Sequence, residues 1–172
     1  MKRLNEYEFQ IDKIKHIGKI RHYTTGFALI EILESGMLIA NKSIGDKELK
    51  DIVLHNKTIS FHDVRIDPEY SAIIKHNRKN ERYLNTKTLG LHIQKICCCI
   101  EIDYDKLDKS IEDKTYFLNI NGHNEVRIEA DIELNKENCK IIIFKGLCNI
   151  TNQLQVIDTA EKYKEKYNIE II

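Results

Sequence analysis

The strongest local constraint on the fold is the stretch "IRHYTTGFALIEILESG", residues 20–36, which begins like a strand and ends like a helix. Residues 17–22 predict a first strand that ends at His22. Thr24 or Thr25 is suited to cap the following helix, and Gly36 is suited to end it in a left-handed conformation. The helix should bury a broad apolar face that comprises Phe27, Leu29, Ile30, Ile32 and Leu33. The stretch therefore predicts a strand, a polar turn and an amphipathic helix.

The rest of the chain has many short β-like runs and few helical ones. Residues 96–103 alternate with a period of two over eight positions, which is typical of a strand. Further strands are expected at residues 57–61, 116–120, 125–129, 140–145 and 168–172, with helices near residues 70–76 and at 152–167. This pattern predicts an α+β fold.

A single domain over residues 1–172 is the simplest interpretation, because the chain has no Pro/Gly/Ser-rich linker and no repeat. Its length is sufficient for a sizeable core. We expect residues 1–16 to form an N-terminal arm and residues 152–172 a closing helix and tail.

The charge balance excludes a generally basic, nucleic-acid-coating protein, since 27 Lys and Arg residues match 27 Asp and Glu residues. This balance does not exclude a local basic groove. No apolar run reaches the roughly 18 residues that a membrane span requires, and "MKRLNEYEFQ" lacks the apolar centre of a secretory signal. We therefore expect no membrane association and a cytoplasmic location.

Five cysteines, three of them consecutive at residues 97–99, form an odd set that favours reduced thiols over a disulfide framework. Neighbouring strand residues point to opposite faces, whereas zinc ligands are usually spaced two to four residues apart, so we expect no metal site. No cysteine lies in a predicted turn or at a predicted helix start, where thiolates are usually stabilised. Cys98 is therefore interpreted as a small core residue.

Common nucleotide and hydrolase motifs are absent: the chain has no Gly-rich phosphate loop, Walker lysine, HExxH or GxSxG. What remains is an ordered set of polar residues, His22, Arg65 and Glu125. Taken singly, each has a structural interpretation: a hydrogen-bonded histidine, a solvated loop arginine, and an exposed strand edge formed by Glu125 and Arg127. Their order along the chain favours a shared site.

That order resembles the ADP-ribosyltransferase-like superfamily, which includes diphtheria-toxin-like and poly(ADP-ribose) polymerase enzymes, RNA 2'-phosphotransferases and the DarT family of DNA-modifying toxins. "RHYTT" and "ALIEILESGMLIA" are similar to its first strand and helix, and "TISF" to its next strand. "SFHDVRIDPEY" supplies Arg65, Pro68 and Tyr70, as in DarT-like enzymes. "CCCIEIDYDKL" is similar to a middle strand, and "NEVRI" places Glu125 at the catalytic glutamate. The likeness spans roughly residues 20–145.

The resemblance implies a single α+β domain with two small packed, mostly antiparallel sheets around a cleft, flanking helices, and NAD+ as substrate without a metal. It implies Glu125 and Arg65 as catalytic residues, with Glu129 as the competing carboxylate. Such a carboxylate would stabilise the oxocarbenium-like ribose or act as a general base. The implied NAD+-binding residues are His22, Tyr23, Thr24, Thr25, Ser60 and Tyr70. The candidates to bind its diphosphate are Arg65 and the turn at Thr24 and Thr25, near a helix N-terminus.

The acceptor of ADP-ribose is expected to be a macromolecule. "KHNRKNERY", residues 75–83, combines cationic and aromatic side chains suited to nucleic acid, although a solvated charged loop or a protein acceptor fits as well. The candidate acceptor-binding residues are Lys75, Arg78, Arg82 and Tyr83. A role in a bacterial toxin, phage defence or phage counter-defence implies a cognate antitoxin or host protein as partner. Two alternatives are a non-catalytic binding protein of this fold and an RNA 2'-phosphotransferase-like enzyme.

Overall fold

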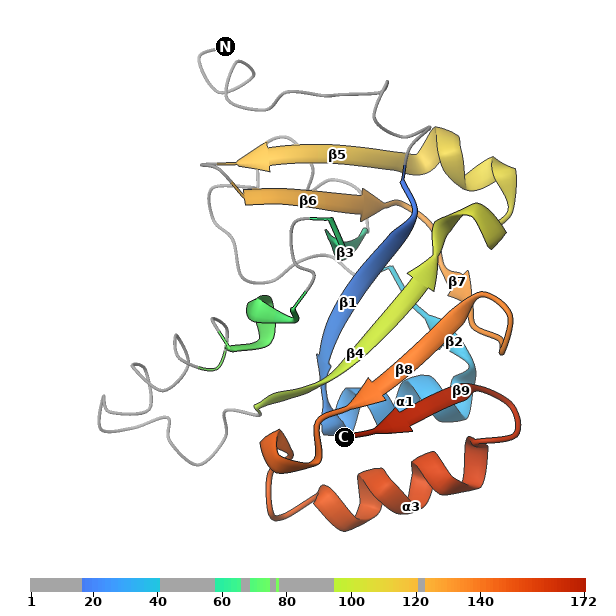
Figure 1. The fold of residues 1–172 in the computed structure, drawn as a ribbon. Coiled ribbons are helices and arrows are strands. Elements are labelled where there is room, and N and C mark those ends of the chain that lie inside the picture. Colours follow the sequence, from blue (N-terminus) through green and yellow to red (C-terminus); the bar gives the residue numbers. More distant parts are fainter. Residues whose placement is uncertain (1–16, 41–57, 66–68, 75–76, 78–94, 121–122) are drawn as a thin grey trace.

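A seven-stranded sheet organises the computed structural model, which describes residues 17–40, 58–65, 69–74, 77, 95–120 and 123–172 (Figure 1). The strands lie in the order β5-β6-β3-β1-β4-β8-β9, and in the described part only β8 and β9 run parallel. Their bounds are β1 Lys19–Thr25, β3 Ile59–Asp63, β4 Ile96–Asp103, β5 Thr115–Ile120, β6 His123–Ile128, β8 Cys139–Ile143 and β9 Asn168–Ile171. The predicted α+β class and mostly antiparallel pairing are confirmed.

The sheet arrangement differs from the two small packed sheets that were expected. One sheet is continuous because β1 pairs with β4 along its length and with β3 at its N-terminal end. The second sheet has two short strands, β2 Met37–Leu38 and β7 Ile132–Glu133. Strand β1 therefore links β3 and β4 into one sheet, where two separate small sheets were expected.

Strand β1 also extends further than predicted, so His22 lies within the strand and not at its end. Partners on β4 hold the polar run extended as far as Thr25, which lies opposite Ile96. Thr25 then caps the next helix, its hydroxyl accepting a hydrogen bond from the backbone N–H of Ala28 at 3.3 Å. The polar run from His22 to Thr25 thus belongs to β1, and Thr25 leads directly into the helix as its cap.

Helix α1, Gly26–Ser35, ends as predicted at Gly36, whose φ of 74° is left-handed and whose N–H donates to the carbonyl of Ile32 at 2.8 Å. The expected apolar face is wrong at Phe27, which is 46% exposed. The buried stripe follows helical spacing and comprises Gly26, Leu29, Ile30 and Leu33. Phe27 lies to the side of this stripe, on the exposed surface of the helix.

The remaining described helices lie in the connections and near the C-terminus. Short 3-10 turns occur at η4 Tyr104–Lys106, η5 Lys109–Lys114 and η6 Lys145–Leu147, α3 spans Gln153–Tyr163, and residues 71–74 and 77 are helical. Helix α3 packs against α1 (Figure 1). No helix in the described residues is both long and apolar enough to cross a bilayer.

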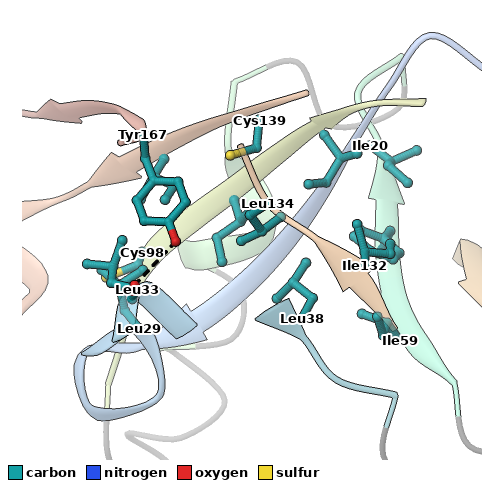
Figure 2. Packing of buried hydrophobic residues seen from close by; sticks show 14 of the residues in the cluster. Ile20, Leu29, Leu33, Leu38, Ile59, Cys98, Ile132, Leu134, Cys139 and Tyr167 are labelled. Atoms are coloured by element: carbon teal, nitrogen blue, oxygen red, sulfur yellow. Dashed lines mark hydrogen bonds between the residues drawn. The ribbon is translucent and has the colours of Figure 1, made fainter. Parts of the chain in front are cut away.

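The core lies between one face of the sheet and the elements that cover it. Ile20, Ile59 and Cys98 from the sheet pack with Leu29 and Leu33 of α1 and with Leu38, Ile132 and Leu134 near the small sheet (Figure 2). Tyr167 is fully buried, and its hydroxyl donates to the carbonyl of Leu33 at 3.3 Å. Nearly every strand contributes to this one cluster, so the described elements share a single core.

Candidate active site

A cleft of about 450 Å³ opens where β1 and β3 stop pairing. The two strands share only two paired positions, Ile20 with Asp63 and Arg21 with His62. Beyond them, His22 and Thr24 of β1 face the start of β3 across the cleft, and α1 with residues 37–39 forms another wall. The volume lies within the range of about 300–1,000 Å³ that is typical of small-molecule sites.

The side chain of His22 bridges the two strands at the base of this opening. Its Nδ1 lies 3.0 Å from the backbone carbonyl of Ser60. A carbonyl only accepts, so Nδ1 carries the proton, and in the neutral ring Nε2 is an acceptor. Burial lowers the pKa of His22 and the nearby His62 lowers it further, although the hydrogen bond to Ser60 opposes this. His22 can therefore accept a hydrogen bond from a hydroxyl or amide in the cleft.

Glu125 is held beside the cleft by two of its lining residues. The carboxylate oxygen Oε2 accepts from the hydroxyl of Ser60 at 3.1 Å and from Nε of Arg127 at 2.9 Å, and Nη2 of Arg127 lies 2.8 Å away. Opposed residues of β3 and β6 place these three side chains on one face. Because Oε1 makes no hydrogen bond to another described residue, this arrangement orients the carboxylate and leaves one oxygen for a ligand.

The competing carboxylate, Glu129, lies just after the end of β6 and accepts a hydrogen bond from the Tyr116 hydroxyl at 2.9 Å. Neither carboxylate is among the residues that line the cleft, but Ser60 and Arg127, which hold Glu125, both line it, and Tyr116 does not. The geometry therefore favours Glu125 as the carboxylate of the site.

Tyr23 and Thr25 do not line the cleft, although His22 and Thr24 do. Successive strand residues point to opposite faces, and the ring of Tyr23 instead packs edge-on against His62 with centroids 5.4 Å apart. Thr25 is occupied as the helix cap. Of the expected run, two residues reach the site.

Tyr70 and Arg65 also lie away from the cleft. The Tyr70 ring stacks on the guanidinium of Arg21, 3.8 Å from Cζ to the ring centroid, and its φ is 58°. Arg65 is 53% exposed and pairs with Asp63, two residues earlier. The structure thus gives each residue a partner that does not line the cleft. Lys75, Arg78, Arg82 and Tyr83 lie outside the described residues.

Two arginines are buried and paired with carboxylates, which was not predicted from the sequence. Arg127, considered only as part of an exposed edge, is 6% exposed on a strand flanked by β3 and β5. Arg21 is buried and donates through Nε to Glu101 at 3.0 Å. The spacing of Glu125 and Arg127, two positions apart in "NEVRI", was the sequence signal for their ion pair. No neighbouring residue in the sequence indicates the pairing of Arg21 with Glu101.

All five cysteines are reduced thiols, as expected. In the described residues, no group of three or more His, Cys, Asp or Glu side chains is arranged to hold a metal ion.

Neither models of known protein families nor curated protein sequences give a match to this chain.

Proposed function

We propose that the protein is an NAD+-dependent ADP-ribosyltransferase with the fold of that superfamily, which binds NAD+ in the β1–β3 cleft and modifies a macromolecular acceptor. The observation that carries the proposal is the carboxylate of Glu125, fixed beside the cleft by Ser60 and Arg127. On the wall formed by β1, His22 offers a neutral acceptor. An acceptor in the cleft wall and a carboxylate bonded to two other lining residues suit a ribose with its two hydroxyls.

The reaction would break the bond between nicotinamide and ribose. Nicotinamide leaves with the bonding electrons, and the ribose carbon becomes an oxocarbenium-like cation, which the negative charge of Glu125 stabilises. A nucleophile of the acceptor then bonds to that carbon, and its proton passes to Glu125 as general base. Arg127 and Ser60 hold the carboxylate so that no reorganisation is needed as charge develops.

The described walls suit the nicotinamide-ribose end of NAD+ better than its diphosphate. Among the described residues that line the cleft, Arg127 is the only cation, and it is already paired with Glu125. Arg65, the expected diphosphate partner, pairs with Asp63. The observation supports ribose positioning as the principal role of the described cleft.

The test is transfer of label from NAD+, labelled in its adenylate phosphate, to separate pools of protein, DNA and RNA. We expect the parent chain to label one pool and Glu125→Ala to lower the rate by about 10²–10³-fold. Glu129→Ala is the matched control, just after the end of the strand that carries Glu125, and should stay within a few fold of the parent.

Calorimetry with millimolar NAD+ separates the alternatives. Binding without transfer by the parent chain would support the non-catalytic binding protein, and absence of binding would refute every NAD-dependent function. Removal of a 2'-phosphate from RNA in the presence of NAD+ would support the RNA 2'-phosphotransferase-like alternative.

A further inference from the structure

Three thiols meet where β4 begins, close to the start of α1 and to the turn after β8. The sulfur atoms of Cys97 and Cys98 lie 3.4 Å apart. Cys148 donates its thiol hydrogen to the carbonyl of Phe144 at 3.6 Å, and the Phe144 N–H donates to the carbonyl of Cys97 at 2.8 Å. The turn that carries Cys148 is therefore docked on the strand that carries Cys97.

Cys97 is the sulfur that this cluster prepares for ionisation. Its sulfur lies 3.4 Å from that of Cys98, and its interactions with Cys98, Cys148 and the backbone N–H of Gly26 each lower its pKa. Gly26 opens the ten-residue helix α1, whose N-terminus favours negative charge. The interaction with Cys98 makes the largest contribution that lowers the pKa of Cys97, and it outweighs the opposing effect of burial. The sequence predicts no cysteine at a helix start, but the tertiary contact with Gly26 places Cys97 beside one.

We propose that Cys97 is a site of oxidation by hydroperoxides and that Cys148 is its disulfide partner. The Cys97 thiolate attacks the peroxide, the O–O bond breaks, and Cys97 becomes a sulfenic acid while an alkoxide or hydroxide leaves and takes up a proton. The sulfur of Cys148 then attacks Cys97, the S–O bond breaks, and its thiol proton leaves with the hydroxyl as water. Two thiols and one hydroperoxide give one disulfide, one alcohol or water, and one further water.

Backbone geometry selects Cys148 over Cys98 as the partner. Adjacent Cα atoms across a trans peptide are about 3.8 Å apart, below the roughly 4.4–6.8 Å that disulfides span. Cys98 is therefore suited to stabilising the thiolate and unsuited to bonding with it. Cys148 sits in a turn outside β4, so this restriction does not apply.

Burial limits which oxidant can react. Cys97 is 1% exposed and Cys148 is 8% exposed, whereas Ile150, two residues after Cys148, is 94% exposed. Solvent thus reaches the turn that carries Cys148, and the burial of both sulfurs favours a small hydroperoxide over a bulky thiol reagent. Oxidation also removes the thiolate that accepts from Gly26, at the start of the helix that lines the cleft with Ala28.

The experiment oxidises the reduced full chain with hydrogen peroxide, alkylates remaining thiols in denaturant and maps tryptic peptides by mass spectrometry. We expect a disulfide that links peptide 96–106 to peptide 146–162. Because the first peptide holds three cysteines, single variants assign the bond. Cys97→Ser and Cys148→Ser should lower the linked species at least about tenfold, and Cys148→Ser should accumulate a Cys97 sulfenic acid that a 1,3-dione traps.

Cys99→Ser is the matched control, since Cys99 lies on the same strand and in the same peptide but beside Tyr23 on the other face; it should leave the linkage unchanged. Fragmentation of the linked wild-type peptides assigns the sulfur even if a variant fails to fold. A linkage that persists in Cys97→Ser, a bond through Cys98, or no linkage in folded protein at peroxide levels that oxidise the denatured chain would each overturn the proposal. The readout does not depend on transferase activity.

Discussion

The carboxylate of Glu125 and the guanidinium of Arg127 form an ion pair between two positions of the same strand, with Oε2 2.9 Å from Nε and 2.8 Å from Nη2. The pair is unequal in exposure: Arg127 is buried, while Glu125 is partly open to solvent. Removing the carboxylate leaves a buried cation without its charged partner, whereas removing the arginine leaves a more accessible anion without its charged partner. The two residues should therefore behave as a unit.

Glu125→Ala, Arg127→Ala and the double variant form a mutant cycle that measures this unit. We expect an interaction free energy on the order of 0.5–3 kcal/mol in the free energy of unfolding, because each single variant leaves an unpaired charge. Chemical denaturation of all four chains provides the measurement. Strictly additive effects would show that the contact does not stabilise the fold.

Ser60→Ala tests whether the Ser60 hydroxyl positions the carboxylate for the proposed reaction. The hydroxyl donates to Oε2 at 3.1 Å, and the side chain lies in the cleft wall and not in the hydrophobic core. We expect kcat for ADP-ribosyl transfer to fall about tenfold with KM for NAD+ within about threefold, because orientation of Glu125 is lost and ground-state binding is kept. Ser60→Thr, which retains a hydroxyl, should recover part of kcat. A rise in KM alone would mean that Ser60 binds NAD+ and does not orient Glu125.

His22 should make the fold less stable in mild acid. In the unfolded chain its ordinary pKa is 6.5, and in the folded chain burial lowers that pKa. Below pH 6.5 the unfolded state therefore binds more protons, so the free energy of unfolding decreases as the pH falls toward the folded pKa. In His22→Asn, whose side-chain amide can still donate to the Ser60 carbonyl, the decrease between pH 7 and pH 5 should be smaller. Equal pH dependence in both chains would contradict a lowered pKa.

The features that sequence analysis located well depend on neighbours along the chain. Thr25 caps α1 and Gly36 ends it because capping and left-handed geometry involve residues only a few positions apart. The eight-residue alternation likewise gave the bounds of β4. Sequence signals were thus sufficient to place the cap and the end of α1 and the bounds of β4, because the residues that determine them are near in the sequence.

The features it located poorly depend on which strands become neighbours. His22 lies inside β1 because β4, far along the chain, extends the pairing to Thr25. Glu125 reaches Ser60 through the register of β6 on β3, and Cys97 reaches Gly26 through the docking of β4 beside α1. Periodicity fixes the face on which a side chain lies, but it contains no information about the partner strand.

Gly36→Ala should destabilise the fold for two separable reasons. Its φ of 74° disfavours a side chain, and an added Cβ would lie 2.9 Å from the hydroxyl oxygen of Tyr167. We expect the free energy of unfolding to fall by about 1–3 kcal/mol, measured by denaturant titration. Tyr167→Phe removes the obstructing hydroxyl and its hydrogen bond to Leu33, which alone should cost about 1 kcal/mol. In the Tyr167→Phe background, Gly36→Ala should then cost less than in the parent, because the nearest obstructing atom is gone while the backbone strain and the approach to Lys166 Nζ at 3.3 Å persist. An equal cost in both backgrounds would assign the whole effect to φ, and a larger cost would contradict the close approach of the two residues.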